Sequence, residues 1–136
     1  MNFSTINWLA VIVATISSFA IGGLWYSPVL FGNIWMKEVK MDKDAKVSKG
    51  TMFKIFGLTF VFSFIIAVNL AMFLNDPKTT ASWGAAAGFL AGFGWATMSI
   101  FILTLFENRS WKYRLIHAGY TTVTYVLMGL IIGAWR

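Results

Sequence analysis

Long apolar segments alternate with short polar ones along the whole chain. Four apolar segments reach the roughly 20 residues needed to cross a bilayer. None of the four contains Asp, Glu, Lys or Arg, and they cover approximately residues 5–26, 55–74, 83–106 and 115–135. So small a soluble domain could not bury four such helices. The pattern therefore predicts an all-α fold, a four-helix transmembrane bundle in which residues 1–136 form a single integral membrane domain.

The end of the first span is marked by the run Trp-Tyr-Ser-Pro at residues 25–28. Aromatic rings favour the membrane–water interface, and Ser27 followed by Pro28 fits a helix N-cap and first helical position. Beyond them, large apolar residues recur at every fourth position, namely Phe31, Trp35 and Val39. We predict a short amphipathic helix over approximately residues 28–40, lying along the headgroup plane. An irregular interfacial loop is the alternative.

Each span also carries small residues at four-residue intervals. They are Ala10, Ala14, Ser18 and Gly22 in the first span, Ser63, Ala67 and Ala71 in the second, Gly84, Gly88, Gly92 and Ala96 in the third, and Gly129 and Gly133 in the fourth. Lipid provides no hydrophobic drive between helices, so association depends on close backbone packing. We predict that these glycines form the helix contacts. Bulky faces such as Phe53, Phe60 and Phe64 remain, which favours a homo-oligomer.

Charge is scarce and unevenly placed. Charged residues make up 12% of the chain and the net charge is +6, against about 25% charged residues in an ordinary soluble domain. Nine of the eleven basic residues lie in the loops at 36–54 and 107–114. The positive-inside rule predicts that both loops are cytoplasmic and both termini outside, in a multi-pass cell-membrane protein. Anionic lipid explains the basic excess, so we expect the lipid bilayer as partner and no nucleic acid.

Little of the chain offers catalytic or metal chemistry. It has no cysteine, one histidine and five carboxylates, so we expect no metal, no cofactor and no enzymatic activity. The spans lack the acidic residue that proton-coupled transporters usually keep in the membrane. Asn69 is predicted to be a buried amide making one interhelical hydrogen bond, of about 0.6–2 kcal/mol, with a pore or ligand role as the alternative.

A polar cluster is predicted where the third span ends and the fourth begins. We predict that Glu107 and Arg109 pair, either with each other or with aromatic neighbours, and that a buried pair could hold the helical hairpins in register. His117 and Tyr120 open the fourth span, and Glu107 with His117 could form an acid–base pair. The structural role is preferred to a ligand site or catalysis.

Several motifs resemble those of domain-of-unknown-function family 1761, a family of small, multi-pass, largely bacterial membrane proteins. They are "GGLWYSPVLFGNIW", "LFENR", "HAGY" and "LMGLIIGAW", in this order, and they span nearly the whole chain. His117 departs from the family pattern, in which an asparagine is expected. The resemblance supports the membrane topology and implies no reaction.

We therefore predict a non-enzymatic, oligomeric helical bundle with a structural, lipid-interacting or regulatory role. A small passive channel for an ion or small solute, lined by polar groups of the fourth span and by Asn69, is the alternative, and a membrane enzyme acting through Glu107 is a third hypothesis. The candidate structural or ligand-binding residues are Trp25, Tyr26, Pro28, Trp35, Asn69, Glu107, Arg109, His117 and Tyr120.

Overall fold

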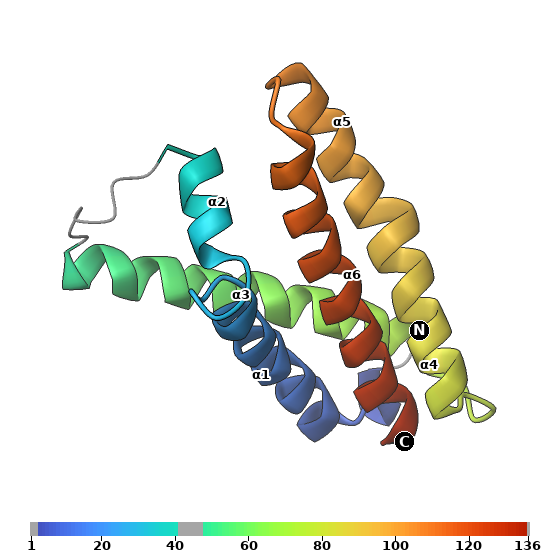
Figure 1. The fold of residues 1–136 in the computed structure, drawn as a ribbon. Helices are drawn as coiled ribbons and strands as arrows, with labels where there is room; N and C mark the ends of the chain where they lie inside the picture. The colour runs from blue at the N-terminus through green and yellow to red at the C-terminus, as the bar shows by residue number, and fades with distance from the viewer. Residues whose placement is uncertain (1–2, 41–47, 136) are drawn as a thin grey trace.

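The structure, a computed structural model, describes residues 3–40 and 48–135, and the regular elements in these ranges are all helices, with no strand (Figure 1). The elements are η1 (Phe3–Thr5), α1 (Trp8–Trp25), α2 (Gly32–Glu38), α3 (Lys49–Phe73), α4 (Ala81–Phe89), η2 (Leu90–Thr97), α5 (Met98–Phe106) and α6 (Trp111–Ala134). Here η2 is a π-helix that joins α4 to α5, so that residues 81–106 form one continuous helix. Four helices are long and apolar enough to cross a membrane, which confirms the predicted fold class.

Polar caps set where the spans begin. The side-chain oxygens of four residues accept a hydrogen bond from the backbone N–H three residues later, namely Asn7, Ser48, Thr80 and Ser110. Capping by Ser48 starts α3 at Lys49 rather than at the predicted residue 55. The loop predicted over 36–54 is therefore helical at both ends, and Lys43 and Lys46 lie outside the described residues.

The helix predicted over residues 28–40 is shorter, because residues 26–31 form a tight turn. The carbonyl of Ser27 accepts hydrogen bonds from the N–H groups of Leu30 and Gly32, at 3.1 and 2.9 Å, and its hydroxyl donates to the Leu24 carbonyl at 2.7 Å. Ser27 and Pro28 therefore belong to the turn and do not start α2. The helix α2 begins at Gly32. A Cβ at this position would overlap the backbone of Tyr26 and Ser27, so the turn requires a glycine there.

The closest helix pair is the hairpin formed by α4 and α6. A Cβ on Gly84 would overlap the Gly129 carbonyl oxygen, and one on Gly88 would overlap that of Tyr125. Gly92 faces the Tyr125 side chain, while Gly133 lies against the backbone of Gly84 and Thr80. These contacts bring the backbones of the two helices together, the arrangement expected of small residues in membrane helices.

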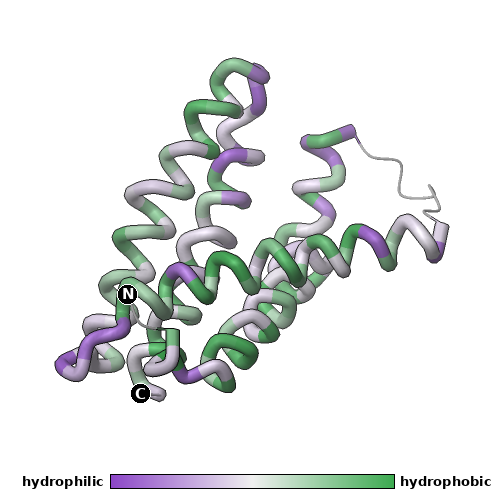
Figure 2. Tube along the Cα trace, turned by 180° about the vertical axis from the view of Figure 1, so that it is seen from behind, coloured by the Kyte–Doolittle hydropathy of each residue, from purple (hydrophilic) through white to green (hydrophobic). Residues whose placement is uncertain are grey.

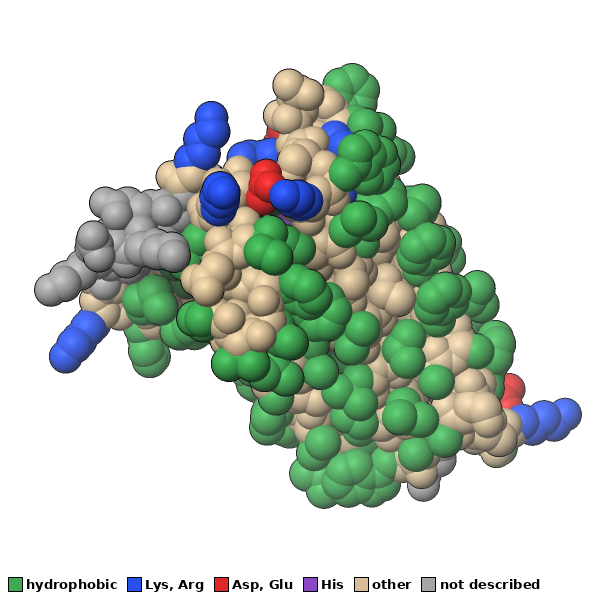
Figure 3. All heavy atoms as spheres, viewed as in Figure 1, with side chains coloured by type: hydrophobic (Ala, Val, Ile, Leu, Met, Phe, Trp, Pro, Cys, Tyr) green, Lys and Arg blue, Asp and Glu red, His purple; other side chains and the backbone are tan. Residues whose placement is uncertain are grey.

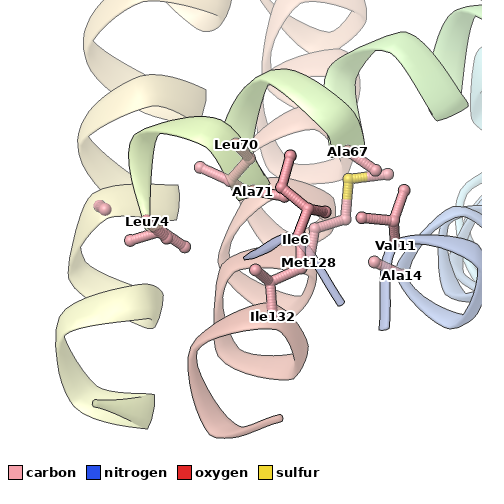
Figure 4. Packing of buried hydrophobic residues seen from close by; sticks show 10 residues of the cluster. Ile6, Val11, Ala14, Ala67, Leu70, Ala71, Leu74, Met128 and Ile132 are labelled. Carbon is pink, nitrogen blue, oxygen red and sulfur yellow. The ribbon is translucent and has the colours of Figure 1, made fainter. Parts of the chain in front are cut away.

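A small apolar core joins α1, α3 and α6, with Ala87 of α4, near one end of the bundle. Figure 4 shows side chains from all three helices converging there. The buried residues are Ile6, Val11, Ala14, Ala67, Leu70, Ala71, Leu74, Ala87, Met128 and Ile132. The last part of α3 therefore packs against the bundle through the small residues Ala67 and Ala71.

The first half of α3 extends away from this core, as the green helix does in Figure 1. Each residue from 48 to 62 is exposed. Figure 2 shows that this part of α3 is mostly hydrophobic, apart from its start. Hydrophobic exposure of this kind is expected of a helix surrounded by lipid.

The two ends of the bundle differ in charge. At one end, Glu38 of α2 accepts a hydrogen bond from Ser110 at 2.7 Å, which places α2 beside the α5–α6 turn. At the other end Asn7 donates to the Trp135 carbonyl at 3.0 Å, joining the two terminal segments. In Figure 3, Lys and Arg side chains gather over the first of these ends, and hydrophobic side chains cover most of the surface between the two.

Candidate functional site

The turn after α1 packs against the start of α6 and forms a cluster of aromatic rings around one histidine. This aromatic–histidine cluster consists of Trp25, Tyr26, Trp35, Tyr113, His117 and Tyr120. It unites most of the residues that the sequence singled out, drawn from three separate segments. Pro28 lies outside it, exposed in the adjoining turn.

Two hydrogen bonds attach the turn to α6. The indole Nε1–H of Trp25 donates to the Ile116 carbonyl at 2.9 Å. The hydroxyl of Tyr26 lies 2.6 Å from Nδ1 of His117. Gly119 makes room for this docking, because a Cβ at that position would press against the Trp25 ring. The motif at residues 25–28 therefore joins the first span to the fourth.

Ring packing fills the space around Tyr26. Its ring centroid lies 5.4 Å from that of Trp35, 5.6 Å from that of His117 and 5.2 Å from that of Tyr120. The Tyr113 ring covers His117 at 4.4 Å. The three separations from Tyr26 fall within the range of favourable aromatic pairs, and the Tyr113–His117 contact is closer still, so the cluster is packed by its own side chains.

Burial also affects the ionisation and hydrogen bonding of the polar atoms in the cluster. Desolvation, with smaller contributions from Tyr120 and Tyr113, raises the pKa of Tyr26 well above its ordinary value. Its hydroxyl therefore stays protonated at physiological pH. Nε2 of His117 is buried and has no hydrogen-bond partner among the described residues. The geometry suits a neutral hydrogen-bonded pair that holds two helices together.

Tyr120 extends the cluster along α1. Its hydroxyl donates to the Ser18 carbonyl at 3.4 Å. A Cβ on Gly22 would lie 3.2 Å from the same hydroxyl. Gly22 thus gives the Tyr120 ring space beside α1, a helix–side-chain contact rather than the backbone contact seen between α4 and α6.

A second polar group lies at the α5–α6 turn and was not among the predicted site residues. Arg114 is only 4% exposed. Its Nε–H donates to the Thr104 hydroxyl at 3.0 Å and its Nη2–H to the Thr104 carbonyl at 2.8 Å. The guanidinium also lies 4.7 Å from the Trp111 ring centroid. A cation is favoured at a helix C-terminus, and Arg114 occupies this position at the end of α5.

Glu107 and Arg109 pair with each other, as predicted, but the pair is exposed. Their charged atoms are 3.6 Å apart, and the side chains are 59% and 40% exposed, respectively. Both residues lie in the same short turn, so the expected buried pair between hairpins is not formed. The contacts between elements come instead from Arg114 and from the bond between Ser110 and Glu38. Glu107 pairs with Arg109 and His117 with Tyr26, and no hydrogen bond or ion pair joins Glu107 to His117 in the described part of the chain.

Asn69 is exposed, which contradicts the prediction of a buried amide. Its Nδ2–H donates to the Ile65 carbonyl of its own helix at 2.8 Å. The cause is helical geometry: Asn69 lies two residues from the buried Ala67 and Ala71 and so faces away from them. The amide therefore points toward the surroundings of the bundle.

The third span contains the π-helical segment η2, which the sequence analysis did not predict. The Thr97 hydroxyl donates to the Gly92 carbonyl at 2.7 Å and lies 3.2 Å from the Thr122 hydroxyl of α6. π-Helical turns leave backbone groups that need another partner in lipid. Gly92 and Gly94, with Thr97 a few residues later, are the signal that could have indicated this segment.

Hollows of the described surface lie at the edges of the bundle. One of about 370 Å³ opens between α1 and α3, and one of about 280 Å³ lies at the end that carries the termini. The described residues contain no group of three His, Cys, Asp or Glu side chains that could hold a metal ion.

The helices and their contacts define a multi-pass, all-helical membrane protein with a tightly packed hairpin and a turn after the first span that docks on the fourth. The sequence model of a family described as "Protein of unknown function (DUF1761)" matches residues 9–133. The chain therefore belongs to this family. No curated protein and no solved structure matches the chain.

Proposed function

We propose that this protein is a non-enzymatic, homo-oligomeric membrane bundle with a structural, lipid-interacting or regulatory role. The observation that carries the proposal is the exposed amide of Asn69 on α3. Among the other candidate residues, Pro28 lies in the turn after α1, Glu107 and Arg109 form an ion pair, and the rest are held by ring contacts and hydrogen bonds within one copy. Asn69 alone among them places a strong polar group on an otherwise apolar outer surface.

Depth in the membrane makes this exposure costly. The 25 residues of α3 extend about 37 Å, longer than the roughly 30 Å hydrocarbon core. Asn69 lies one turn before the end at Phe73, about 6 Å along the axis, so its amide remains at hydrocarbon depth. Its Oδ1 accepts no hydrogen bond from the described residues, and an unsatisfied polar atom in lipid is unfavourable.

A second copy can satisfy this amide. In a two-fold dimer the same surface patch meets itself, so Asn69 of each copy would face the other and exchange hydrogen bonds. Ile65 and Phe62 share this helix face, at the preceding turns, and are both exposed. If the α3 helices of the two copies cross near Asn69, their Lys49 ends lie apart, which avoids like-charge repulsion. Membrane amide pairs contribute about 0.6–1.7 kcal/mol each.

Cysteine cross-linking tests the proposal directly, because the chain has no native cysteine. In vesicles, we expect Asn69→Cys to form a disulfide-linked dimer under mild oxidation, whereas Leu103→Cys should not. Leu103 is the matched control, since it lies on α5 and is 64% exposed. An Asn69→Leu variant should remain folded but become monomeric in dilute detergent. Monomeric wild type, or equal cross-linking at both positions, would overturn the proposal.

A small passive channel is the second candidate, supported by the buried hydroxyls of Thr15, Ser18 and Thr97 inside the bundle. These hydroxyls already donate to carbonyls of their own helices, at 2.6–2.8 Å. Hydroxyls used in this way serve the helix backbone. Asn69, on the outer surface, cannot line a path through a single copy. For these reasons we rank the channel below the oligomeric bundle.

A further inference from the structure

We propose that the groove between α1 and the first half of α3 binds an anionic phospholipid. One acyl chain would lie along the phenylalanines of α3, and the phosphate would lie at Lys49. This inference deepens the lipid-interacting role proposed above by naming the lipid class and its site. It uses the opposite face of α3 from Asn69, so the two proposals can fail independently.

The groove is lined by apolar residues and opens toward the start of α3, where this helix diverges from α1 in Figure 1. It holds about 370 Å³ and is lined by Ile16, Phe19, Phe53, Phe56, Gly57 and Phe60. Phe19 and Phe60 close its narrow end, with ring centroids 6.0 Å apart. Toward the wide end, apart from the adjoining backbone of α3 itself, no atom lies within 4 Å of the Cβ position of Gly57. The shape therefore fits a slender hydrocarbon chain that enters from the wide end.

Positive charge lies at the wide end. Lys49 precedes Phe53 by four residues and Phe60 by eleven, so these residues share one face of α3. Lys54 of α3, Lys37 of α2 and Lys40, two residues beyond the end of α2, are also exposed. A phosphate at Lys49 would thus meet an exposed positive charge at the end of the apolar groove.

Charge also favours a lipid over a second copy in this groove. A second copy related by an axis along the membrane normal would run parallel to the first and bring its own lysine-rich end to the same level. Like charges would then face one another, whereas an anionic headgroup neutralises them. The groove also narrows to the Phe19–Phe60 contact, which a helix about 10 Å across could not follow. Among the possible occupants, an anionic lipid matches both the charge and the shape.

Native mass spectrometry can test the site after extraction from two kinds of vesicle, phosphatidylcholine alone and an equimolar mixture with phosphatidylglycerol. We expect the wild type to retain phosphatidylglycerol in preference to phosphatidylcholine. Gly57→Leu should fill the groove and abolish retention of both lipids. Gly94→Leu is the matched control, because Gly94 also has no atom within 4 Å of its Cβ position and lies on another span.

A second pair of variants tests the headgroup contact without altering the groove. Lys49→Gln should lower the preference for phosphatidylglycerol about fivefold, the effect of one basic residue near an anionic surface. Lys78→Gln, at the opposite end of the bundle, should leave it unchanged.

Unchanged retention in Gly57→Leu, or equal effects of the two lysine variants, would overturn the inference. So would loss of dimerisation in Gly57→Leu, because it would identify a second copy as the occupant. Cross-linking at Asn69→Cys in the same samples reports separately on the oligomer.

Discussion

Gly84 and Gly129 show how a single missing Cβ governs the tightest contact in this bundle. At both positions a Cβ would overlap the carbonyl oxygen of the other glycine. Dispersion between closely approaching backbones replaces the hydrophobic drive that lipid does not supply. Gly23, Gly57 and Gly94 have no atom within 4 Å of their Cβ positions, so their lack of a side chain serves no contact within one copy.

At the residue scale we expect Gly84→Ala to destabilise the fold by about 1–3 kcal/mol, the usual cost of overpacking. The added Cβ would also lie 3.0 Å from the Gly133 Cα, so neither helix can absorb it without moving. Thermal unfolding in detergent measures the effect. Gly94→Ala is the matched control and should leave the melting temperature unchanged or slightly raised, since alanine is the better helix former. Equal melting temperatures for the two variants would contradict the contact.

At the scale of elements, the α5–α6 turn depends on one buried cation. Arg114 places its guanidinium at the C-terminal end of α5 while belonging to the first turn of α6. Asn108, which has a positive φ of 56°, reverses the chain direction between the two helices. The turn is thus stabilised by a charge-assisted contact to a helix end, and the exposed Glu107–Arg109 pair contributes little beside it.

We expect Arg114→Gln to lower stability by about 1.5–3 kcal/mol, the range for hydrogen bonds to charged groups. Arg114→Lys should be intermediate, because lysine keeps the charge but lacks the planar fork of donors. Lys112→Gln serves as the control, since Lys112 is exposed in the same helical turn. Detergent unfolding monitored by circular dichroism measures all three. A Lys112→Gln variant as unstable as Arg114→Gln would contradict this role for Arg114.

At the scale of the whole molecule, contacts between distant segments form two ends of the bundle that differ in charge. The end with α2 and the α5–α6 turn carries most of the described positive charge, and the other end carries both terminal segments. Asn75 adds to the second end by donating to the Thr5 hydroxyl at 2.7 Å. This grouping agrees with an even number of spans, and the positive-inside rule predicts that the basic end faces the cytoplasm.

Cysteine labelling in intact cells checks that orientation. We expect Lys78→Cys to react with a membrane-impermeant thiol reagent added outside. Lys112→Cys should react only after the membrane is opened. Both positions are exposed, so a difference between them reflects sidedness. The reverse pattern would show that both termini face the cytoplasm.

Hydrophobic pattern alone determined the four spans, their order and the grouping of the basic loops. These features follow from transfer free energies of uncharged helices, which depend on composition along the chain. The glycines of the third and fourth spans could likewise be singled out, because close packing in lipid selects small residues whatever their partner.

Tertiary structure alone decided which faces meet. The sequence reasoning expected Asn69 inside the bundle and Glu107–Arg109 buried, and it treated Arg114 as an ordinary loop charge. The face that α3 presents depends on α1 and α6, and the burial of Arg114 depends on Thr104 ten residues before it. The spacing of apolar residues and the composition describe one helix at a time, whereas the burial of a side chain depends on the neighbouring helices. This is why the docking of Trp25 and Tyr26 on α6, across 91 residues of chain, could be seen only in the folded protein.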